Sequence, residues 1–230
     1  MKQNPAQSVL FTETQQKIWE TKGIFSDRYI RTKLKDDKLY PNEERVKLLW
    51  EFCSNLWNKL HIALGKGNEE LTKREFLEPI LEKLGFAYSI EISLPGGSTP
   101  DYLLFIDEKS KESVLAEKGA TQCKMAISLL EAKKVNHPLG DVSKHETPGR
   151  FPHQQVRDYL QDASDESGKP YFRWAILTNG NIWRLYCRDA RQRDYFEFNL
   201  KMGIASYSYE DFAKFITLFS PSAFIRNVEG

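Results

Sequence analysis

Cysteine is scarce in this chain of 230 residues, which has three thiols, Cys53, Cys123 and Cys187. Their spacing fits no metal-ligand pattern, and an odd number leaves one thiol without a partner. The four histidines are scattered and show no zinc pattern either. The sequence therefore gives no support for a zinc site, and a reducing cytoplasm is the simplest expected location.

Long apolar runs, targeting segments and nucleotide-binding motifs are also missing. No apolar stretch has the length of a membrane span, and residues 1–5 do not begin a signal peptide. The Gly65-Lys66-Gly67 segment lacks the spacing and the following Ser or Thr of a phosphate-binding P-loop. We therefore expect no membrane partner, and no motor or methyltransferase activity within this chain.

Neither sign of charge is in excess, because 33 Lys and Arg stand against 32 Asp and Glu for a net charge of +1. This balance excludes a strongly basic nucleic-acid binder, so any affinity for DNA must come from local charge. Residues 133–157 are the best candidate, although a merely solvated loop remains an alternative. Their cations and histidines are Lys133, Lys134, Lys144, Arg150, Arg157, His137, His145 and His153, against Asp141 and Glu146.

Periodicity predicts an α/β domain with a central mixed sheet, helices on both faces and a preceding helical segment. Helical spacing covers residues 41–64, 71–84 and 209–219, and strand patterns cover 102–106, 127–133, 174–178, 182–186 and 195–199. Asn179-Gly180 predicts a hairpin with a type I′ turn. We expect a helical segment at 1–68, a core at 69–220 and a tail at 221–230 that links to further domains.

Charged residues stand at the ends of two predicted strands. Asp101 precedes one, and Leu129-Leu130 leads into Glu131-Ala132-Lys133 in the other. Residues i and i+2 of a strand share a face, so Glu131 and Lys133 should project together. Glu-Xaa-Lys is also common on solvated faces, but a charged pair at the end of a buried strand is costly unless it has a role.

These residue types suit hydrolysis of a phosphodiester. Mg²⁺ is usually held by one or two carboxylates together with water and substrate oxygens. Asp101 and Glu131 would be the carboxylate ligands, and the backbone carbonyl of Ala132 could add a third oxygen. Lys133 could orient the attacking water, or deprotonate it if its pKa were lowered.

At this point the chain resembles the PD-(D/E)XK nuclease superfamily. The resemblance is to the N-terminal nuclease domain of type I restriction enzyme R subunits and to fused type IIG-like restriction-modification proteins. Beyond Asp101, Glu131 and Lys133, it rests on Gln155 and Tyr159, similar to the family's Gln-x-x-x-Tyr element, and on the hairpin of 174–180 and 182–186. It covers roughly residues 71–219.

The resemblance implies a restriction-endonuclease-like fold and a Mg²⁺-dependent endodeoxyribonuclease, with Mn²⁺ as a possible substitute. It implies a place in a restriction-modification or phage-defence system, with DNA as substrate and separate motor, methyltransferase or specificity domains as partners. Two alternatives stay open. One is a repair or RNA nuclease of the same fold, and the other is a non-catalytic domain that binds DNA or a partner.

Further site residues follow from the same resemblance. Gln155 would contact the site or the substrate, with Gln154 as a rival, while Tyr159 would contact substrate or simply pack on the sheet. Lys134 and Arg157 are expected substrate contacts. Related nucleases often place an acidic residue of the first core helix near the metal. Glu78 is the candidate here, with a solvated carboxylate as the alternative.

Overall fold

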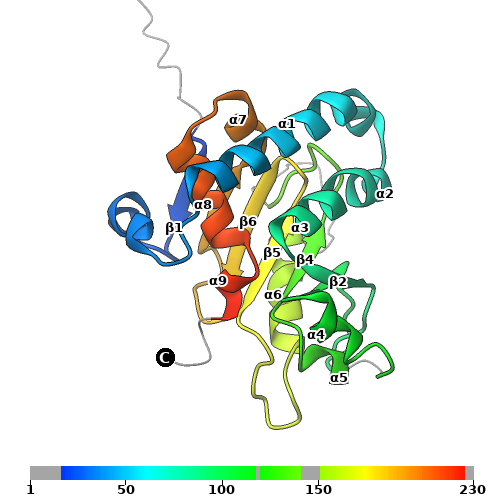
Figure 1. The fold of residues 1–230 in the computed structure, drawn as a ribbon. Helices are drawn as coiled ribbons and strands as arrows, with labels where there is room; N and C mark the ends of the chain where they lie inside the picture. The colour runs from blue at the N-terminus through cyan, green and yellow to red at the C-terminus, as the bar shows by residue number, and fades with distance from the viewer. Residues whose placement is uncertain (1–16, 118–119, 141–150, 226–230) are drawn as a thin grey trace, which may run out of the picture.

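The computed structural model describes residues 17–117, 120–140 and 151–225 (Figure 1). Its centre is a seven-stranded mixed sheet with the strand order β1-β7-β6-β5-β4-β3-β2. Only β4 and β5 pair in parallel, and every other neighbouring pair is antiparallel. The strands are β1 Trp19–Lys22, β2 Ala87–Ile90, β3 Tyr102–Phe105, β4 Ser128–Ala132, β5 Trp174–Thr178, β6 Ile182–Cys187 and β7 Tyr195–Asn199.

The helices begin and end where local chemistry favours it. Asn42 caps the longest helix by accepting a hydrogen bond from the Arg45 amide, and Gly85 ends another helix with a φ of +103° that suits glycine. The α-helices are α1 Glu43–Lys66, α2 Glu69–Thr72, α3 Glu78–Leu84, α4 Glu108–Glu112, α5 Ala120–Cys123, α6 Pro152–Asp162, α7 Leu200–Ala205, α8 Tyr209–Phe219 and α9 Ser222–Ile225. Two π-helical turns, η1 Tyr29–Lys33 and η3 Lys73–Leu77, and a 3₁₀ turn, η2 Leu34–Asp36, complete the set.

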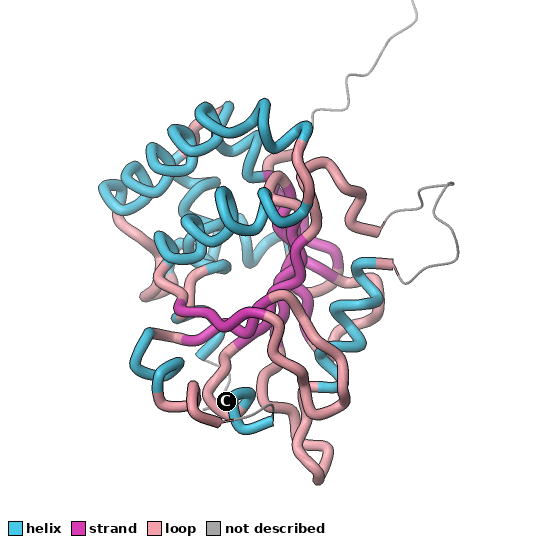
Figure 2. Tube along the Cα trace, turned by 90° about the vertical axis from the view of Figure 1, so that its right-hand side faces the viewer, coloured by secondary structure: helices cyan, strands magenta, loops and turns pink. Residues whose placement is uncertain are grey.

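Helices cover both faces of the sheet, as the sequence predicts. The core on one face contains buried side chains of α1, α3 and α8, and Figure 2 shows the helices gathered on this side of the strands. The core on the other face contains buried side chains of α6, which links β4 to β5. Successive residues of β3 alternate between the two cores, Tyr102 and Leu104 in the first and Leu103 and Phe105 in the second.

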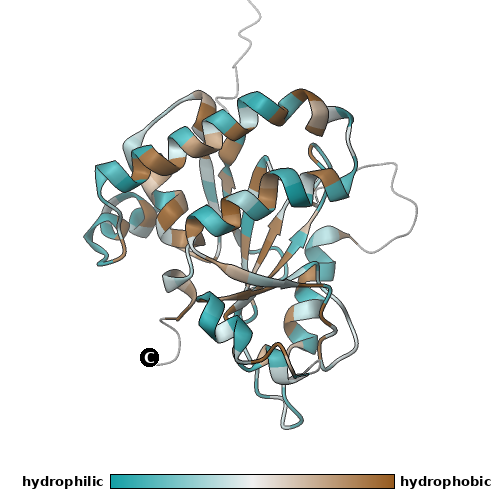
Figure 3. Ribbon diagram, turned by 45° about the vertical axis from the view of Figure 1, so that its right-hand side comes forward, coloured by the Kyte–Doolittle hydropathy of each residue, from teal (hydrophilic) through white to brown (hydrophobic). Residues whose placement is uncertain are grey.

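Several predicted elements are confirmed. The predicted strand 195–199 is β7, and the predicted helix 209–219 is α8. Residues 108–124, which hold α4 and α5, lie between β3 and β4 in the sequence. The two strands are still neighbours in the sheet, because Tyr102 pairs with Leu130 and Leu103 with Leu129. In Figure 3 brown, hydrophobic stretches alternate with teal, hydrophilic ones along the helices and run through the strands, in keeping with these two cores.

The turn between β5 and β6 differs from the predicted type I′ form. Gly180 has a φ of +82°, but Asn179 is not among the described residues with positive φ. The Asn179 side-chain oxygen instead accepts hydrogen bonds from the amides of Asn181 and Ile182. An asparagine side chain thus closes a three-residue loop, so its backbone need not enter the left-handed region.

The prediction of a purely helical segment at 1–68 is wrong for residues 19–22. These residues form β1, an edge strand that pairs with β7 from Trp19↔Phe198 to Lys22↔Tyr195. Side chains of this segment, including Val46, Leu49 and Cys53, also share one core with Phe76 and Phe215. Residues 17–68 therefore belong to the same packed unit as the rest of the described chain, and residues 1–16 lie outside the described residues.

The last described residues also pack on that unit. Within the expected tail 221–230, α9 places the buried Phe224 ring against Phe86, with 5.8 Å between ring centroids. Residues 226–230 lie outside the described residues. No helix in the described ranges is both long enough and apolar enough to cross a membrane.

Candidate active site

The antiparallel pairing of β3 with β4 brings Asp101 and Glu131 together. Tyr102 lies opposite Leu130, so Asp101 and Glu131 are the next residues at that end of the pair. Asp101 Oδ2 accepts a hydrogen bond from the Ala132 amide at 2.7 Å. The two carboxylates therefore come from residues far apart in sequence and meet at one edge of the sheet.

Glu131 and Lys133 lie on one face of β4, as the sequence predicts. Glu131 is 3% exposed, and its Oε1 accepts a hydrogen bond from Lys133 Nζ at 2.6 Å. Burial raises the pKa of the Glu131 carboxyl, the negative charge of Asp101 raises it further, and Lys133 acts in the opposite direction. A buried carboxylate next to another is a costly arrangement that a bound cation would relieve.

The Ala132 carbonyl points to the same edge as Asp101. The Lys133 amide donates to the Thr178 carbonyl at 2.8 Å, so Lys133 directs its backbone groups toward β5. Backbone groups of neighbouring residues in a strand point to opposite sides, and both groups of one residue point to the same side. The Ala132 amide donates to Asp101, which precedes β3, so the Ala132 carbonyl also points toward β3.

Lys73 is a site residue that sequence reasoning missed. Its ammonium forms an ion pair with Asp101 Oδ1 and lies 3.6 Å from Glu69, with its side chain 14% exposed. Burial lowers the pKa of Lys73, but the hydrogen bond and charge of Asp101 outweigh this effect, and the net pKa is raised. Lys73 opens the π-helical turn η3, a form of helix that is often found at functional sites.

Glu78 is not brought to this cluster. Its two carboxylate oxygens accept hydrogen bonds from the hydroxyls of Tyr102 at 3.0 Å and Tyr88 at 3.2 Å. Tyr102 belongs to the core of the face opposite Glu131 and Lys133, the face that α1, α3 and α8 cover. The structure thus places the expected acidic residue of the first core helix in a tyrosine network.

The element Gln155 to Tyr159 lies on α6, which packs on β4 and β5. Gln155 Nε2 donates to the Tyr159 hydroxyl at 2.5 Å, so the two residues share a helix face as their spacing predicts. Tyr159 is buried in the same core as Leu129, whereas Gln154 is exposed. Gln155 thus lies on the sheet face that carries Glu131, with its amide held by Tyr159.

Arg157, an expected substrate contact, binds backbone carbonyls of the protein itself. Its two terminal nitrogens donate to four backbone carbonyls in and around the segment that joins β6 to β7. The carbonyls belong to Cys187, Ala190, Arg191 and Asp194, at distances of 2.8, 3.0, 2.5 and 3.0 Å. These bonds leave no terminal N–H group for a phosphate. Lys134, in contrast, is exposed directly after β4.

Part of the predicted basic segment lies outside the described residues. This part is residues 141–150, which include Asp141, Lys144, His145, Glu146 and Arg150. The charges of the described portion that remain near the site are Lys133 and Lys134.

The donor set fits a hard divalent cation. No group of three His, Cys, Asp or Glu side chains in the described ranges could hold a metal ion. Asp101, Glu131 and the Ala132 carbonyl instead offer two carboxylates and one backbone oxygen, ligand types that Mg²⁺ accepts together with water. Each carboxylate is paired with a lysine, so a metal ion would replace or share Lys73 and Lys133 as the counter-charge.

Protein-family models, curated proteins and solved structures contain no match to this chain. The residues of the site are therefore the basis on which a function can be argued.

Proposed function

We propose that this chain is a Mg²⁺-dependent endodeoxyribonuclease domain with a restriction-endonuclease-like core, which hydrolyses phosphodiester bonds of DNA. The observation that supports the proposal best is the placement of Asp101 beside Glu131 at the end of β3 and β4. Lys133 Nζ donates a hydrogen bond to Glu131 Oε1 at 2.6 Å. This is the charge pattern that metal-assisted hydrolysis of an anionic ester requires.

The roles follow from the contacts. Asp101, Glu131 and the Ala132 carbonyl would hold Mg²⁺, with Mn²⁺ as a substitute. When bound, the ion would neutralise charge on the phosphate and supply a better nucleophile than neutral water. The water oxygen attacks phosphorus, one P–O ester bond breaks, and the products are a phosphate monoester and a free hydroxyl.

Two lysines and an amide serve the substrate. Lys133, held by Glu131, can donate a hydrogen bond to the attacking water and stabilise charge that develops on the phosphate. Lys73 lies on the other side of the carboxylate pair and can contact a non-bridging phosphate oxygen once Asp101 binds metal. Gln155 is placed on the same sheet face to position the strand, and the exposed Lys134 can contact a neighbouring phosphate.

The biological setting is part of the proposal. A nuclease domain of this type would act in the cytoplasm, within a restriction-modification or phage-defence system, together with motor, methyltransferase or specificity domains. Cleavage of both DNA strands would need two such sites, so transient pairing of two copies is expected.

The proposal is tested by incubating the purified chain with supercoiled plasmid, linear duplex, single-stranded DNA and RNA in Mg²⁺ or in EDTA. Asp101→Asn is the test variant, because its amide oxygen can still accept from the Ala132 amide while the charge is lost. We expect DNA cleavage by the wild type in Mg²⁺ alone and at least a hundredfold loss in Asp101→Asn. Asp27→Asn, at an exposed carboxylate, is the control.

The result also separates the alternatives. Preferential cleavage of RNA would favour an RNA nuclease of the same fold. DNA binding without cleavage, together with equal Mn²⁺ affinity of the wild type and Asp101→Asn, would contradict the proposal and favour a binding domain.

A further inference from the structure

A row of paired residues runs across the sheet from the candidate active site. Glu131 of β4 pairs with Leu177 of β5, Leu177 with Arg184 of β6, and Arg184 with Glu197 of β7. Paired residues in neighbouring strands point to the same face, so Glu131 and Arg184 share the face that α6 covers. Two strand spacings separate their backbones, or about 10 Å.

Arg184 lines a cavity of about 530 Å³ on the side of the row away from Glu131. Lys22 of β1, Tyr186 of β6 and Tyr195 of β7 line it, together with the residue before α6, Phe151. A volume of this size lies within the range of about 300–1,000 Å³ typical of small-molecule sites. The cavity can therefore hold a ligand of the size of one nucleotide.

Two arginines of the cavity differ in burial and in their contacts. Arg184 is 9% exposed, and its Nε and Nη1 donate to Glu197 at 2.6 Å and to the Leu139 carbonyl at 2.9 Å. Neither of these bonds uses Nη2, and the Arg184 side chain lies beside the Tyr186 hydroxyl on the wall of the cavity. Arg193, on the segment before β7, is exposed.

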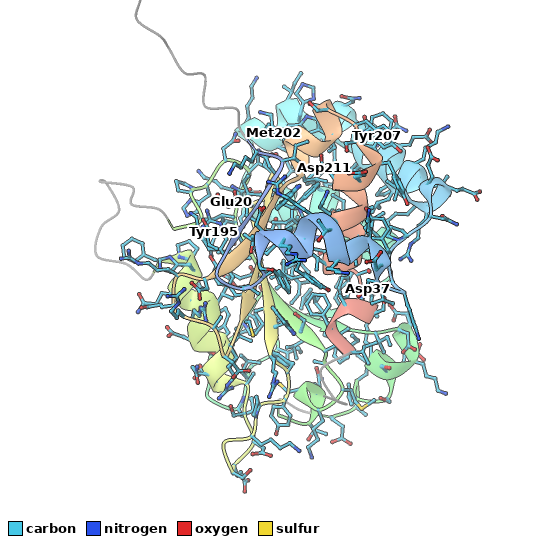
Figure 4. The ribbon with its side chains drawn as sticks, turned by 90° about the vertical axis from the view of Figure 1, so that its left-hand side faces the viewer. Glu20, Asp37, Tyr195, Met202, Tyr207 and Asp211 are labelled. Carbon is cyan, nitrogen blue, oxygen red and sulfur yellow. The ribbon has the colours of Figure 1, made fainter. Side chains whose placement is uncertain are left out.

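Lys22, another cation of the cavity lining, is exposed but engaged by its neighbours. Lys22 Nζ donates to the Tyr195 hydroxyl at 2.6 Å and lies 3.3 Å from Glu20. The Tyr195 hydroxyl in turn donates to Glu20 at 3.0 Å, and Figure 4 shows Glu20 and Tyr195 close together. Glu20 and Glu197 thus compensate Lys22 and Arg184, which leaves Arg193 as the uncompensated charge among the described lining residues.

The cavity also offers polar and flat apolar surfaces. Tyr186 is 1% exposed, and its buried hydroxyl lies against the Arg184 side chain without a well-oriented hydrogen bond to a described residue. Such a group is costly to leave unsatisfied and is a natural contact for a ligand. Phe151 is 39% exposed and stacks on His153 with 5.7 Å between ring centroids, which leaves an aromatic surface available.

We propose that this cavity binds one nucleotide of a DNA strand, with its phosphate on Arg184 and Arg193 and its base against Phe151. Cations next to an exposed aromatic ring are the combination by which proteins hold single nucleotides, since the backbone is anionic and every base has a flat face. Gln192, on the same segment as Arg193, adds an amide that can donate to and accept from a base edge. The inference rests on the proposed function in one respect: the nuclease site would place this nucleotide close to the scissile phosphate.

The test is binding without metal, measured by the anisotropy of a fluorescein-labelled ten-nucleotide single-stranded DNA in EDTA. The variants are Phe151→Ala, Tyr186→Phe and Arg193→Ala, and the control is Arg191→Ala, an exposed arginine of the same segment that does not line the cavity. Tyr186→Phe keeps the ring and removes only the hydroxyl beside Arg184, so its fold is retained. An oligonucleotide with abasic sites and free dTMP serve as competitors.

We expect Phe151→Ala to weaken binding about tenfold, in line with the loss of one base-stacking contact. Tyr186→Phe and Arg193→Ala should each weaken it about threefold to fivefold, while Arg191→Ala stays within about twofold of wild type. The abasic strand should compete poorly, and it should bind Phe151→Ala and wild type alike.

Equal affinity of all variants would overturn the inference, and so would equal competition by abasic and base-bearing strands. Competition by dTMP at the same concentration as the strand would show a site for a free nucleotide and would also overturn it. This assay is run in EDTA and measures binding alone. Absence of cleavage with the expected variant pattern would therefore reject the nuclease proposal and keep the nucleotide site.

Discussion

Asp101 and Ala132 are joined directly, since Asp101 Oδ2 accepts a hydrogen bond from the Ala132 amide at 2.7 Å. Ala132 lies between Glu131 and Lys133, so this bond fixes the first carboxylate against the strand that carries the other two functional side chains. Lys73 holds the second oxygen of Asp101. The four charged groups therefore form one cluster of two carboxylates and two ammonium groups.

Lys73 competes with a metal ion for Asp101. Lys73→Met keeps much of the side-chain volume and removes the charge, and we expect it to bind Mn²⁺ about threefold to tenfold more tightly, because a charge-assisted bond need no longer be displaced. Titration calorimetry measures the affinity, with Lys47→Met on the exposed face of α1 as the control. Unchanged or weaker binding in Lys73→Met would show that the ion pair does not oppose the metal.

Glu131 gives the fold a specific pH dependence. Burial raises the pKa of its carboxyl, and Asp101 adds to the effect. The folded state then binds a proton more readily than the unfolded chain, so ionised Glu131 costs stability above the unfolded pKa. The cost is full above the raised folded pKa, decreases as the pH falls below it, and is gone below the unfolded pKa.

We therefore expect Glu131→Gln to raise the free energy of unfolding by about 1 kcal/mol at pH 8 and by less at pH 5. Urea unfolding at the two pH values measures the difference. Glu112→Gln, at an exposed carboxylate of α4, should change neither value. A loss of stability in Glu131→Gln at pH 8 would mean that the bond to Lys133 outweighs burial.

Elements with strong local patterns could be predicted from the sequence. The alternation of 195–199 and the apolar spacing of 209–219 match β7 and α8 residue for residue. The shared face of Glu131 and Lys133 also follows from the two-residue period of a strand. These features depend on the local chain, so the local sequence contains the information.

Features set by distant contacts could not be predicted. Trp19–Lys22 is short, and it becomes a strand only because β7, far along the chain, offers it an edge. Lys73 lies in a helical stretch with ordinary polar spacing, and nothing near it in sequence indicates an ion pair with Asp101. The pairing of lysines with both carboxylates therefore becomes visible only when the sheet and η3 are assembled.

The contacts of Arg157, a predicted substrate contact, are also made with residues distant in the sequence. Its guanidinium binds four carbonyls near the β6 to β7 connection, so we expect Arg157→Ala to cost about 2–4 kcal/mol of unfolding free energy. DNA affinity per folded molecule should fall by no more than in Arg193→Ala, because Arg157 acts only by holding the segment that carries Arg193. Urea unfolding and anisotropy at 10 °C test both statements, with Arg74→Ala at an exposed ion pair as the control. Weaker DNA binding at full stability would restore the substrate role.

Glu78 offers a negative test of the metal site. Its carboxylate accepts from Tyr88 and Tyr102 on the opposite sheet face, so Glu78→Gln should leave Mn²⁺ affinity within about twofold of wild type. The amide oxygen can still accept from a tyrosine, which limits any loss of stability. Titration of Glu78→Gln beside Glu131→Gln makes the comparison. A similar loss of affinity in both variants would place Glu78 at the metal.

The most direct test is nicking of supercoiled plasmid in Mg²⁺ by Lys133→Ala and by Lys134→Ala. Both variants lose one positive charge at the end of β4, but only Lys133 contacts Glu131, while Lys134 is exposed. The account predicts metal-dependent nicking by wild type, at least a hundredfold loss in Lys133→Ala, and only a small, salt-sensitive reduction in Lys134→Ala. Equal nicking by Lys133→Ala and wild type, or nicking that persists in EDTA, would contradict it.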